Sequence, residues 1–249
     1  MSSTSTFSVI NGKANYPFVF SCEHASAAIP TPPSLADQSF LHTHWGVDIG
    51  AKGVVEELCS ITHSAGILST FSRLWVDLNR PIQATDLIRQ EVEQESIPFN
   101  RGLTSQQIDE RIAGYYTPYH NAFGDLVAER ARSNVPFLLI SVHSFTPIWS
   151  GTLRTMDVGV LFNHHEDLAE RLQYFLQREE LFTALNQPYS GKSASGTVGL
   201  IHSVEQQGLH HQIPYLELEI NQTLISTRAR EKHIASKIGR ALQQLYTTI

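Results

Sequence analysis

Cysteine is scarce in this sequence, and lysine and arginine form no basic run. The two cysteines, Cys22 and Cys59, both lie among apolar residues. Two thiols are too few for a disulfide framework in a chain of 249 residues, so we expect a reduced, cytoplasmic setting. The formal net charge of −6 and the lack of basic clusters argue against nucleic acid or an anionic membrane surface as a partner.

Long apolar runs are also missing. No stretch approaches the roughly 20 apolar residues that a membrane-spanning helix requires. The first residues, MSSTSTFSVINGK, contain no basic segment followed by an apolar core, so we expect no secretion signal. With 41% hydrophobic and 17% charged residues, the composition is typical of a globular protein, and we expect one domain over residues 1–249.

Strand-like and helix-like segments alternate along the chain. The apolar runs predict strands at 17–22, 66–71, 74–78, 135–142, 157–162 and 213–220. Helical spacing predicts helices at 46–61, 104–132, 165–177 and 228–246, the second with a cap at Thr104 or Ser105 and a kink or a break at Pro118. Several strands are apolar on both faces, which predicts an α/β protein with a mixed, mainly parallel sheet and helices on both faces.

Two histidines stand where predicted buried strands end. His24 follows the run FVFSC, and His143 follows LLISV. Binding sites in parallel α/β sheets lie at the carboxyl ends of the strands, so both histidines are candidates for one shared site. Two histidines and a carboxylate around an open position make a catalytic zinc site. Spacing alone leaves open the alternative that each is a hydrogen-bonded histidine closing a strand.

Other polar groups lie near the same predicted strand ends. Asp48 either completes a metal site or caps the helix that follows it. Arg73 and Arg80 either bind an oxyanion and a carboxylate or pair with surface acids. Glu217 and Glu219 alternate with apolar residues, which places both on one face, ordinarily the solvent face of a half-buried strand.

Several familiar catalytic signatures are missing. The sequence contains no HExxH, no CxxC pair and no GxSxG, and HxxE fails because Ala27 occupies the acidic position after His24. Cys22 precedes His24 closely, but it lies in the apolar run, which argues against a nucleophilic thiol. The individual motifs therefore do not identify a reaction.

The order of the motifs is more informative than any one of them. From about Phe18 to Leu224, the set SCEHASAAIP, VDIGA, SRLWVDLNRP, YYTPYHNAF, ISVHSFTP and LELEINQ resembles the N-formylglutamate amidohydrolase family. That family is related to the zinc carboxypeptidases and the aspartoacylases. The resemblance implies a phosphorylase/hydrolase-like α/β fold. It also implies hydrolysis of an amide bond in a small substrate that carries a free carboxylate.

The resemblance assigns metal ligands. His24 and His143 match histidines of the family and are implied to bind one Zn²⁺ ion. For the third ligand it favours Asp48, which matches a family aspartate, with Glu23 as the second choice. His120 is matched as well, but no role follows for it.

The resemblance also assigns catalytic and binding roles. RLWVDLNR is similar to an aspartoacylase stretch, so Arg73 is implied to polarise the scissile carbonyl, and Asn79 and Arg80 to bind the substrate carboxylate. Glu219, in LEIN, is implied to be the general base. The implied reaction is hydrolysis of N-formyl-L-glutamate to formate and L-glutamate.

Two departures from the family pattern weaken the choice of substrate. The chain has EHAS where family members in histidine breakdown carry PHSG, and NQ where they carry NR after LEI. A carboxypeptidase-like or peptidoglycan-peptide hydrolase, and a non-catalytic relative that binds a small ligand, are therefore alternatives. The Gly- and Ser-rich segment 186–199 is either a lid over the substrate or an ordinary surface loop.

Overall fold

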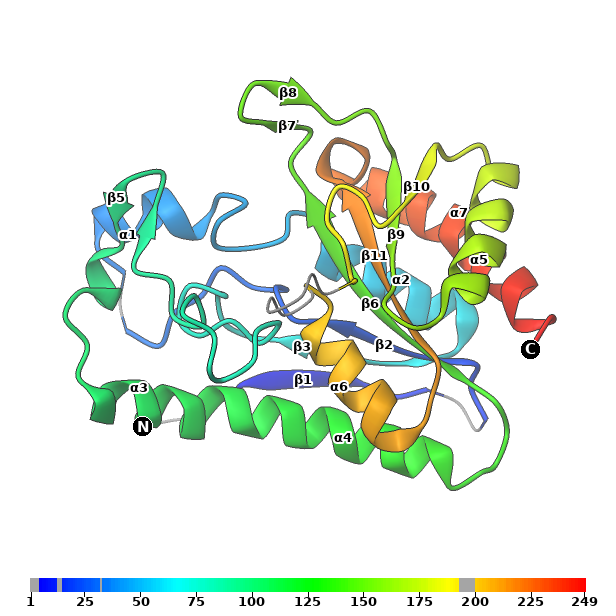
Figure 1. The fold of residues 1–249 in the computed structure, drawn as a ribbon, viewed down its shortest axis with the longest axis horizontal. Helices are drawn as coiled ribbons and strands as arrows, with labels where there is room; N and C mark the ends of the chain where they lie inside the picture. Colours follow the sequence, from blue (N-terminus) through cyan, green and yellow to red (C-terminus); the bar gives the residue numbers. More distant parts are fainter. Residues whose placement is uncertain (1–4, 13–14, 32, 193–199) are drawn as a thin grey trace.

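A seven-stranded sheet forms the centre of the molecule (Figure 1). The computed structural model describes residues 5–12, 15–31, 33–192 and 200–249. The strand order is β1-β3-β2-β6-β11-β9-β10. The strands are β1 (Phe7–Ile10), β2 (Phe18–Cys22), β3 (Ala65–Ser69), β6 (Leu138–Phe145), β9 (Val158–Leu161), β10 (Thr183–Leu185) and β11 (Tyr215–Asn221).

The middle of the sheet is parallel and its two sides are not. β3, β2, β6 and β11 run in one direction, β1 is antiparallel to β3, and β9 is antiparallel to β11. β10 is parallel to β9. The predicted mixed, mainly parallel sheet is therefore confirmed.

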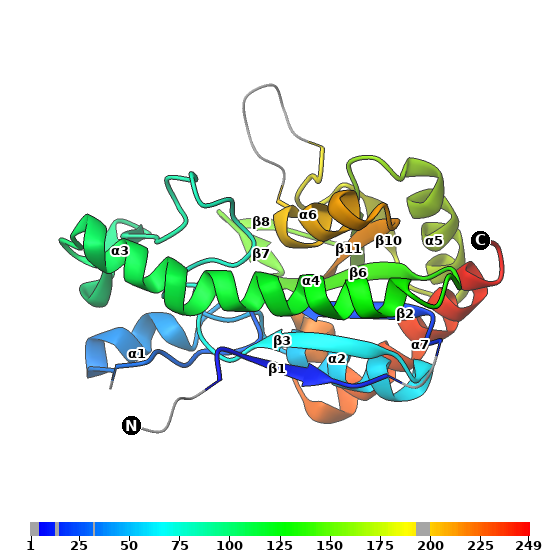
Figure 2. The ribbon, with the colours of Figure 1, turned by 90° about the horizontal axis from the view of Figure 1, so that it is seen from below.

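Helices cover both faces of the sheet. One face packs against α2 (Ala51–Thr62), α5 (Glu166–Arg178) and α7 (Arg228–Tyr246), and the other against α4 (Thr117–Ala131) and α6 (His202–His211). Figure 2 shows α4 running along one side of the sheet, away from α2 and α7. Strand β2 contributes to both cores, because Phe18 and Phe20 pack on the α2 side while Val19 packs on the α4 side.

The helix expected at 104–132 is divided. Thr104 caps α3 (Ser105–Arg111) in a capping box with Gln107, as the cap signal predicted. A π-helical turn (Ile112–Tyr116) then leads into α4, whose first turn holds Pro118. The backbone stays right-handed helical from Arg111 to Thr117, so the segments abut without a break, and Pro118 lies in the first turn of α4, where its missing N–H is tolerated.

Some local elements differ from the expectation. The strand expected at 74–78 is a series of turns, because the side chain of Asp77 accepts a hydrogen bond from the backbone N–H of Asn79 (2.9 Å) and bends the chain. Short elements not predicted are β1, β10, α6, α1 (Leu35–Leu41), two 3-10 turns (Pro98–Asn100, Gln222–Ile225) and the hairpins β4 (Glu91–Val92)–β5 (Glu95–Ser96) and β7 (Ile148–Trp149)–β8 (Thr152–Leu153). Among the described helices, none is both long and apolar enough to cross a membrane.

The strand order creates a crevice between β2 and β6. After β2 the chain moves to β3 on one side, and after β3 it returns to β6 on the other side of β2. The connections beyond the carboxyl ends of β2 and β6 therefore diverge, which leaves a space at a topological switch point. His24 follows β2 and His143 lies in β6, so both reach this space.

Candidate metal centre

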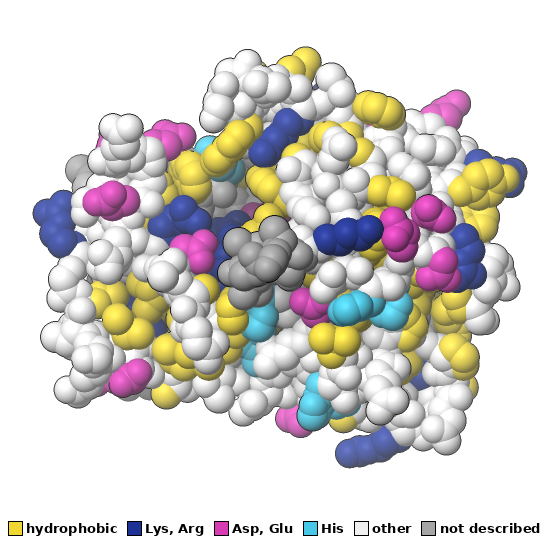
Figure 3. Space-filling view, viewed as in Figure 1, with side chains coloured by type: hydrophobic (Ala, Val, Ile, Leu, Met, Phe, Trp, Pro, Cys, Tyr) yellow, Lys and Arg dark blue, Asp and Glu magenta, His cyan; other side chains and the backbone are white. Residues whose placement is uncertain are grey.

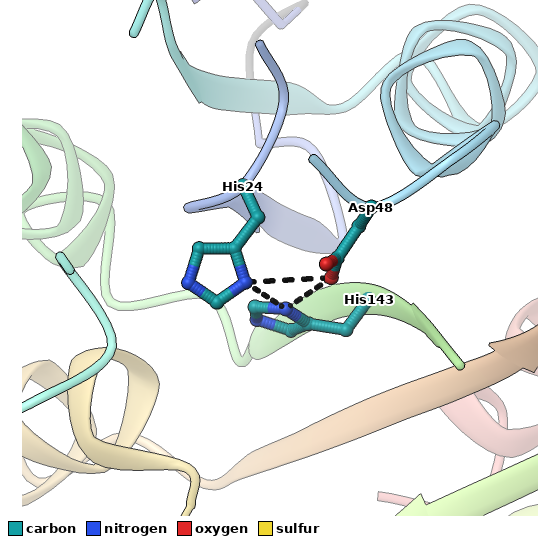
Figure 4. Close-up of side chains that lie close together, drawn as sticks. All are labelled: His24, Asp48 and His143. Carbon is teal, nitrogen blue, oxygen red and sulfur yellow. Dashed lines mark hydrogen bonds and ion pairs between the residues drawn. The ribbon is translucent and has the colours of Figure 1, made fainter. Parts of the chain in front are cut away.

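Three side chains from separate segments converge in the crevice. His24, Asp48 and His143 point toward one another, and all three are buried (Figure 4). His143 Nδ1 lies 3.0 Å from His24 Nδ1 and 2.8 Å from Asp48 Oδ2. His24 Nδ1 lies 3.4 Å from the same carboxylate oxygen. The three residues expected at the metal site are therefore brought together.

The opposite nitrogen of each imidazole faces carboxylates. His24 Nε2 lies 2.7 Å from Asp77 Oδ1. His143 Nε2 lies 3.1 Å from Glu23 Oε2 and 3.5 Å from Glu217 Oε2. A carboxylate on Nε2 favours the proton at that nitrogen and leaves the lone pair on Nδ1. Two Nδ1 lone pairs and one carboxylate oxygen then meet at a single point.

This donor set fits a zinc ion. Catalytic zinc is held by three protein ligands drawn from histidine and acidic residues at about 2.0–2.2 Å, which separates tetrahedral ligands by roughly 3.3 Å. The three donor atoms lie 2.8–3.4 Å apart. Carboxylates behind both imidazoles complete the arrangement, since they orient the rings and raise the basicity of the ligating nitrogens.

Asp48 does not cap the helix that follows it. Helix α2 begins after Gly50, which has a φ of 81°, and no side chain caps it. Asp48 Oδ2 instead accepts a hydrogen bond from the backbone N–H of Ser144 (3.2 Å), and Oδ1 lies 3.6 Å from Arg73 Nη1. Burial would raise the pKa of Asp48, but the neighbouring His24 and His143 lower it, so the side chain is an anion.

Glu23 lies behind His143, on the side away from the three converging atoms. Ser141 Oγ and Tyr119 Oη donate hydrogen bonds to its two carboxylate oxygens. Burial would raise the pKa of Glu23, but the hydrogen bond and charge of His143 lower it to about 2. This geometry favours Asp48 over Glu23 as the third donor and gives Glu23 the task of orienting His143.

A cavity of about 290 Å³ opens beside the three residues. Figure 3 shows a hollow on this face, with basic, acidic and hydrophobic side chains at its edge. Besides His24, Asp48 and His143, the cavity is lined by Arg73, Asn79, Arg80, Arg89, Glu217 and Glu219, and by aromatic residues. The side chains that the sequence favoured for metal, catalysis and substrate therefore border one space, whereas Glu23, the second choice for the third ligand, is not among the lining residues.

Glu217 and Glu219 do not face solvent, which corrects the expectation from their period-two spacing. Strand β11 lies between β6 and β9, and both carboxylates are buried. Burial raises the pKa of Glu217 to about 7 and that of Glu219 well above the usual range. Glu219 Oε2 has no hydrogen-bond partner among the residues that the structure describes. A buried carboxyl group with an unused oxygen at a cavity wall is suited to exchange a proton with a ligand.

The arginines are held by shared carboxylates. Arg73 pairs with Asp77 through Nη2 (2.8 Å). Arg80 Nε and Arg89 Nη2 both pair with one oxygen of Asp86, at 3.0 and 3.2 Å. Two guanidinium groups on one carboxylate leave net positive charge at the cavity wall, which suits an anionic ligand.

The amide of Asn79 is engaged inside the protein. Its Nδ2 donates to Leu200 O (2.7 Å) and to Glu217 Oε2 (3.2 Å), and its Oδ1 accepts from Ser203 N (2.9 Å). Asn79 thus ties the loop after β3 to β11 and α6. Its predicted contact with a substrate carboxylate stays a prediction.

Three residues that the sequence left without a role have clear places. Asp77, the acidic residue of VDLNR, orients both His24 and Arg73 and was missed because the segment looked like a strand. His120 is buried away from the three converging atoms, with Nε2 3.0 Å from Leu78 O. Cys22 is buried, and burial raises the pKa of its thiol, which argues against a thiolate nucleophile.

Segment 186–199 is only partly placed. Tyr189 borders the cavity, whereas positions 193–199 fall outside the described residues. The choice between a lid and a surface loop therefore stays open.

Comparison with known proteins identifies the family. The sequence profile of the N-formylglutamate amidohydrolases matches residues 16–226. A solved structure of a gene product from Agrobacterium tumefaciens superposes with a TM-score of 0.89 at 25% identity, over 99% of this chain and 96% of that one. An N-formylglutamate amidohydrolase from Ralstonia eutropha JMP134 superposes with a TM-score of 0.71 at 16% identity, over 98% and 97% of the two chains.

A solved amidase structure is less similar to this chain. An N-acetylmuramoyl-L-alanine amidase of Nostoc punctiforme has a TM-score of 0.46 at 10% identity, covering 96% of this chain and 100% of that one. Among curated protein sequences, none matches this chain.

The family match confirms the resemblance seen in the ordered motifs. The chain belongs to the N-formylglutamate amidohydrolase family and is an amidohydrolase.

Proposed function

We propose that this amidohydrolase is zinc-dependent and cleaves the amide bond of N-acyl amino acids, with N-formyl-L-glutamate as the first substrate to test. One observation carries the proposal: Nδ1 of His24, Nδ1 of His143 and Oδ2 of Asp48 converge while carboxylates hold the opposite ring nitrogens. The family match supports the same class of reaction.

The proposed centre supplies electrophilic activation. A zinc ion held by His24, Asp48 and His143 would act as a Lewis acid toward water and the amide carbonyl. A neutral amide is a poor electrophile, so this activation and a base are both needed.

Glu219 performs the proton transfers. As a carboxylate it takes a proton from the attacking water as the oxygen bonds to the acyl carbon. It then returns that proton to the amine nitrogen as the carbon–nitrogen bond breaks, releasing a carboxylic acid and an amino acid. Its buried position supports this role, because a raised pKa lets the group hold a proton between the two steps.

Arg73 stabilises the negative charge that develops on the carbonyl oxygen. Its guanidinium group borders the cavity and is fixed by Asp77 and Asp48. A preorganised donor of this kind typically contributes about 3 kcal/mol to the transition state.

The substrate carboxylate binds to the arginines of the cavity wall. Arg80 and Arg89 carry net positive charge, because they share Asp86. The planar guanidinium of Arg80 is suited to a carboxylate, with which arginine forms paired hydrogen bonds that lysine cannot reproduce.

The test combines metal content with activity on the purified protein. We expect about one zinc ion per chain by elemental analysis, hydrolysis of N-formyl-L-glutamate, and loss of both after treatment with a strong chelator. His143→Ala should lose the metal, whereas His233→Ala, at an exposed position of α7, should keep metal and activity. Activity that survives removal of all metal, or a preference for short peptides over N-acyl amino acids, would contradict the proposal.

A further inference from the structure

Aromatic side chains line the outer part of the cavity, where the proposed reaction does not use them. They are His44 and Trp45 from the loop before α2, Trp149 from hairpin β7–β8, and Tyr189 from the loop after β10. The Trp45 and Trp149 rings lie 5.5 Å apart, and His44 lies 6.1 Å from Trp149. Three distant segments thus build one aromatic wall, which we define as His44, Trp45, Trp149 and Tyr189.

Hairpin β7–β8 presents Trp149 to this wall. Its turn residues Ser150 and Gly151 have φ values of 48° and 77°, as a tight two-residue turn requires. Trp149 borders the cavity, whereas Ile148, the preceding residue, points the other way and is 57% exposed. Trp149 itself is 39% exposed, so burial in a core does not account for this tryptophan.

Guanidinium groups stand directly beside the rings. Arg89 lies 5.6 Å from the centre of the Trp45 ring. Arg154 lies 5.3 Å from the Trp149 ring and 5.0 Å from the Tyr189 ring, and donates a hydrogen bond to Tyr189 Oη. Cations therefore lie beside three rings of the wall, at distances typical of cation–π contacts.

This arrangement selects for a particular ligand shape. An aromatic ring on the substrate gains by stacking on the wall, and a carboxylate gains by pairing with Arg80 or Arg89. Arg89 lies 5.6 Å from the Trp45 ring, so a ligand that contacts both groups carries its ring and its carboxylate close together. In an aromatic amino acid only a few bonds separate the ring from the carboxylate, whereas N-formyl-L-glutamate has no ring to place there.

Building on the proposed function, we propose that the preferred substrates are N-acyl derivatives of aromatic amino acids. The ring lies against the wall, the carboxylate pairs with Arg80 or Arg89, and the amide bond reaches toward His24, Asp48 and His143. The wall would thus determine specificity, while the inner end of the cavity performs the hydrolysis.

Wild-type kinetics give the first test. We expect kcat/KM for N-formyl-L-phenylalanine to exceed that for N-formyl-L-glutamate at least tenfold. Trp149→Ala should reduce this ratio about tenfold, whereas Ile148→Ala, the neighbouring exposed position on the same hairpin, should leave it unchanged. Equal or better hydrolysis of N-formyl-L-glutamate by the wild type, or an unchanged ratio in Trp149→Ala, would overturn the inference.

Binding separates this inference from the proposed function. Calorimetry on the Glu219→Gln variant, in which hydrolysis is slowed, measures affinity for the same two compounds, and we expect N-formyl-L-phenylalanine to bind at least tenfold more tightly. Tighter binding of N-formyl-L-phenylalanine, with no hydrolysis of either compound by the wild type, would support the aromatic wall and refute the proposed reaction. Turnover of N-formyl-L-glutamate with equal or weaker binding of the aromatic compound would refute the wall alone.

Discussion

The Nδ1 atoms of His24 and His143 lie 3.0 Å apart, with Asp48 Oδ2 within 3.4 Å of both. Such a group of atoms requires positive charge at its centre, either a proton or a metal ion. Burial would lower the pKa of His143, but Glu217, Asp48 and Glu23 raise it well above the usual value. The surroundings therefore stabilise positive charge between the two histidines. The carboxylates around the histidines contribute to this as much as the ring nitrogens do.

Replacing Asp77 tests this view. Asp77→Asn removes the negative charge beside His24 Nε2 while keeping nearly the same shape. Loss of such a supporting carboxylate typically lowers metal affinity about 10–100-fold. The zinc dissociation constant, measured by competition with a chromogenic chelator, checks this.

Asp86→Asn is the matched control for Asp77. Asp86 pairs with Arg80 and Arg89 rather than with a histidine, so its replacement should leave zinc affinity unchanged. Equal losses in the two variants would mean that Asp77 acts through general charge rather than by orienting His24.

Replacing Glu219 separates metal binding from proton transfer. Glu219→Gln cannot accept a proton from water, so kcat should fall about 10²–10⁴-fold, the usual contribution of a general base. The zinc content should stay at the wild-type level, because Glu219 is not among the three converging residues. A kcat within tenfold of the wild type would place the base elsewhere.

His120 should make stability depend on pH. Burial, and then the charge of His202, lower the pKa of His120 from an unfolded value of 6.5 to about 4. Between these values the unfolded chain binds a proton and the folded protein does not. The stability that the neutral His120 contributes is therefore fully present above pH 6.5. As the pH falls toward 4, the free energy of unfolding decreases by about 3 kcal/mol in all.

A variant at position 120 isolates that effect. His120→Gln keeps a donor toward Leu78 O but does not titrate. Urea unfolding at pH 7 and at pH 4.5 should show a smaller loss of unfolding free energy in the variant than in the wild type. Parallel losses in the two proteins would show that other groups account for the acid sensitivity.

Gly159 should tolerate no side chain. It lies in β9 opposite Glu219, and a Cβ there would collide with the carbonyl oxygen of Gln187. Gly159→Ala should lower the free energy of unfolding by about 1–3 kcal/mol, as overpacking usually does. Gly114→Ala, where a Cβ meets no atom within 4 Å, should change it by less than about 1 kcal/mol. Urea denaturation of both variants checks this, and equal stability would contradict the close approach at Gly159.

Much of the fold was predictable because its signals are local. Apolar runs predicted β2, β6 and β11, and helical spacing predicted α2, α5 and α7. The short strand β10, at three residues, and the short helix α1, at seven, were missed because neither is long enough for its period to stand out. The segment at 74–78 was misjudged, because the apolar run conceals a turn that Asp77 stabilises.

The family, the α/β class and two histidines near the ends of buried strands were predictable from the sequence, since these depend on motif order and short-range periodicity. The carboxylates that surround those histidines, and the aromatic residues that border the cavity, become visible only in the folded chain. His24 meets Asp48, Asp77 and His143 across separations of 24, 53 and 119 residues. Contacts at such separations follow from the order of the strands and the paths of their connecting loops, which no local pattern records.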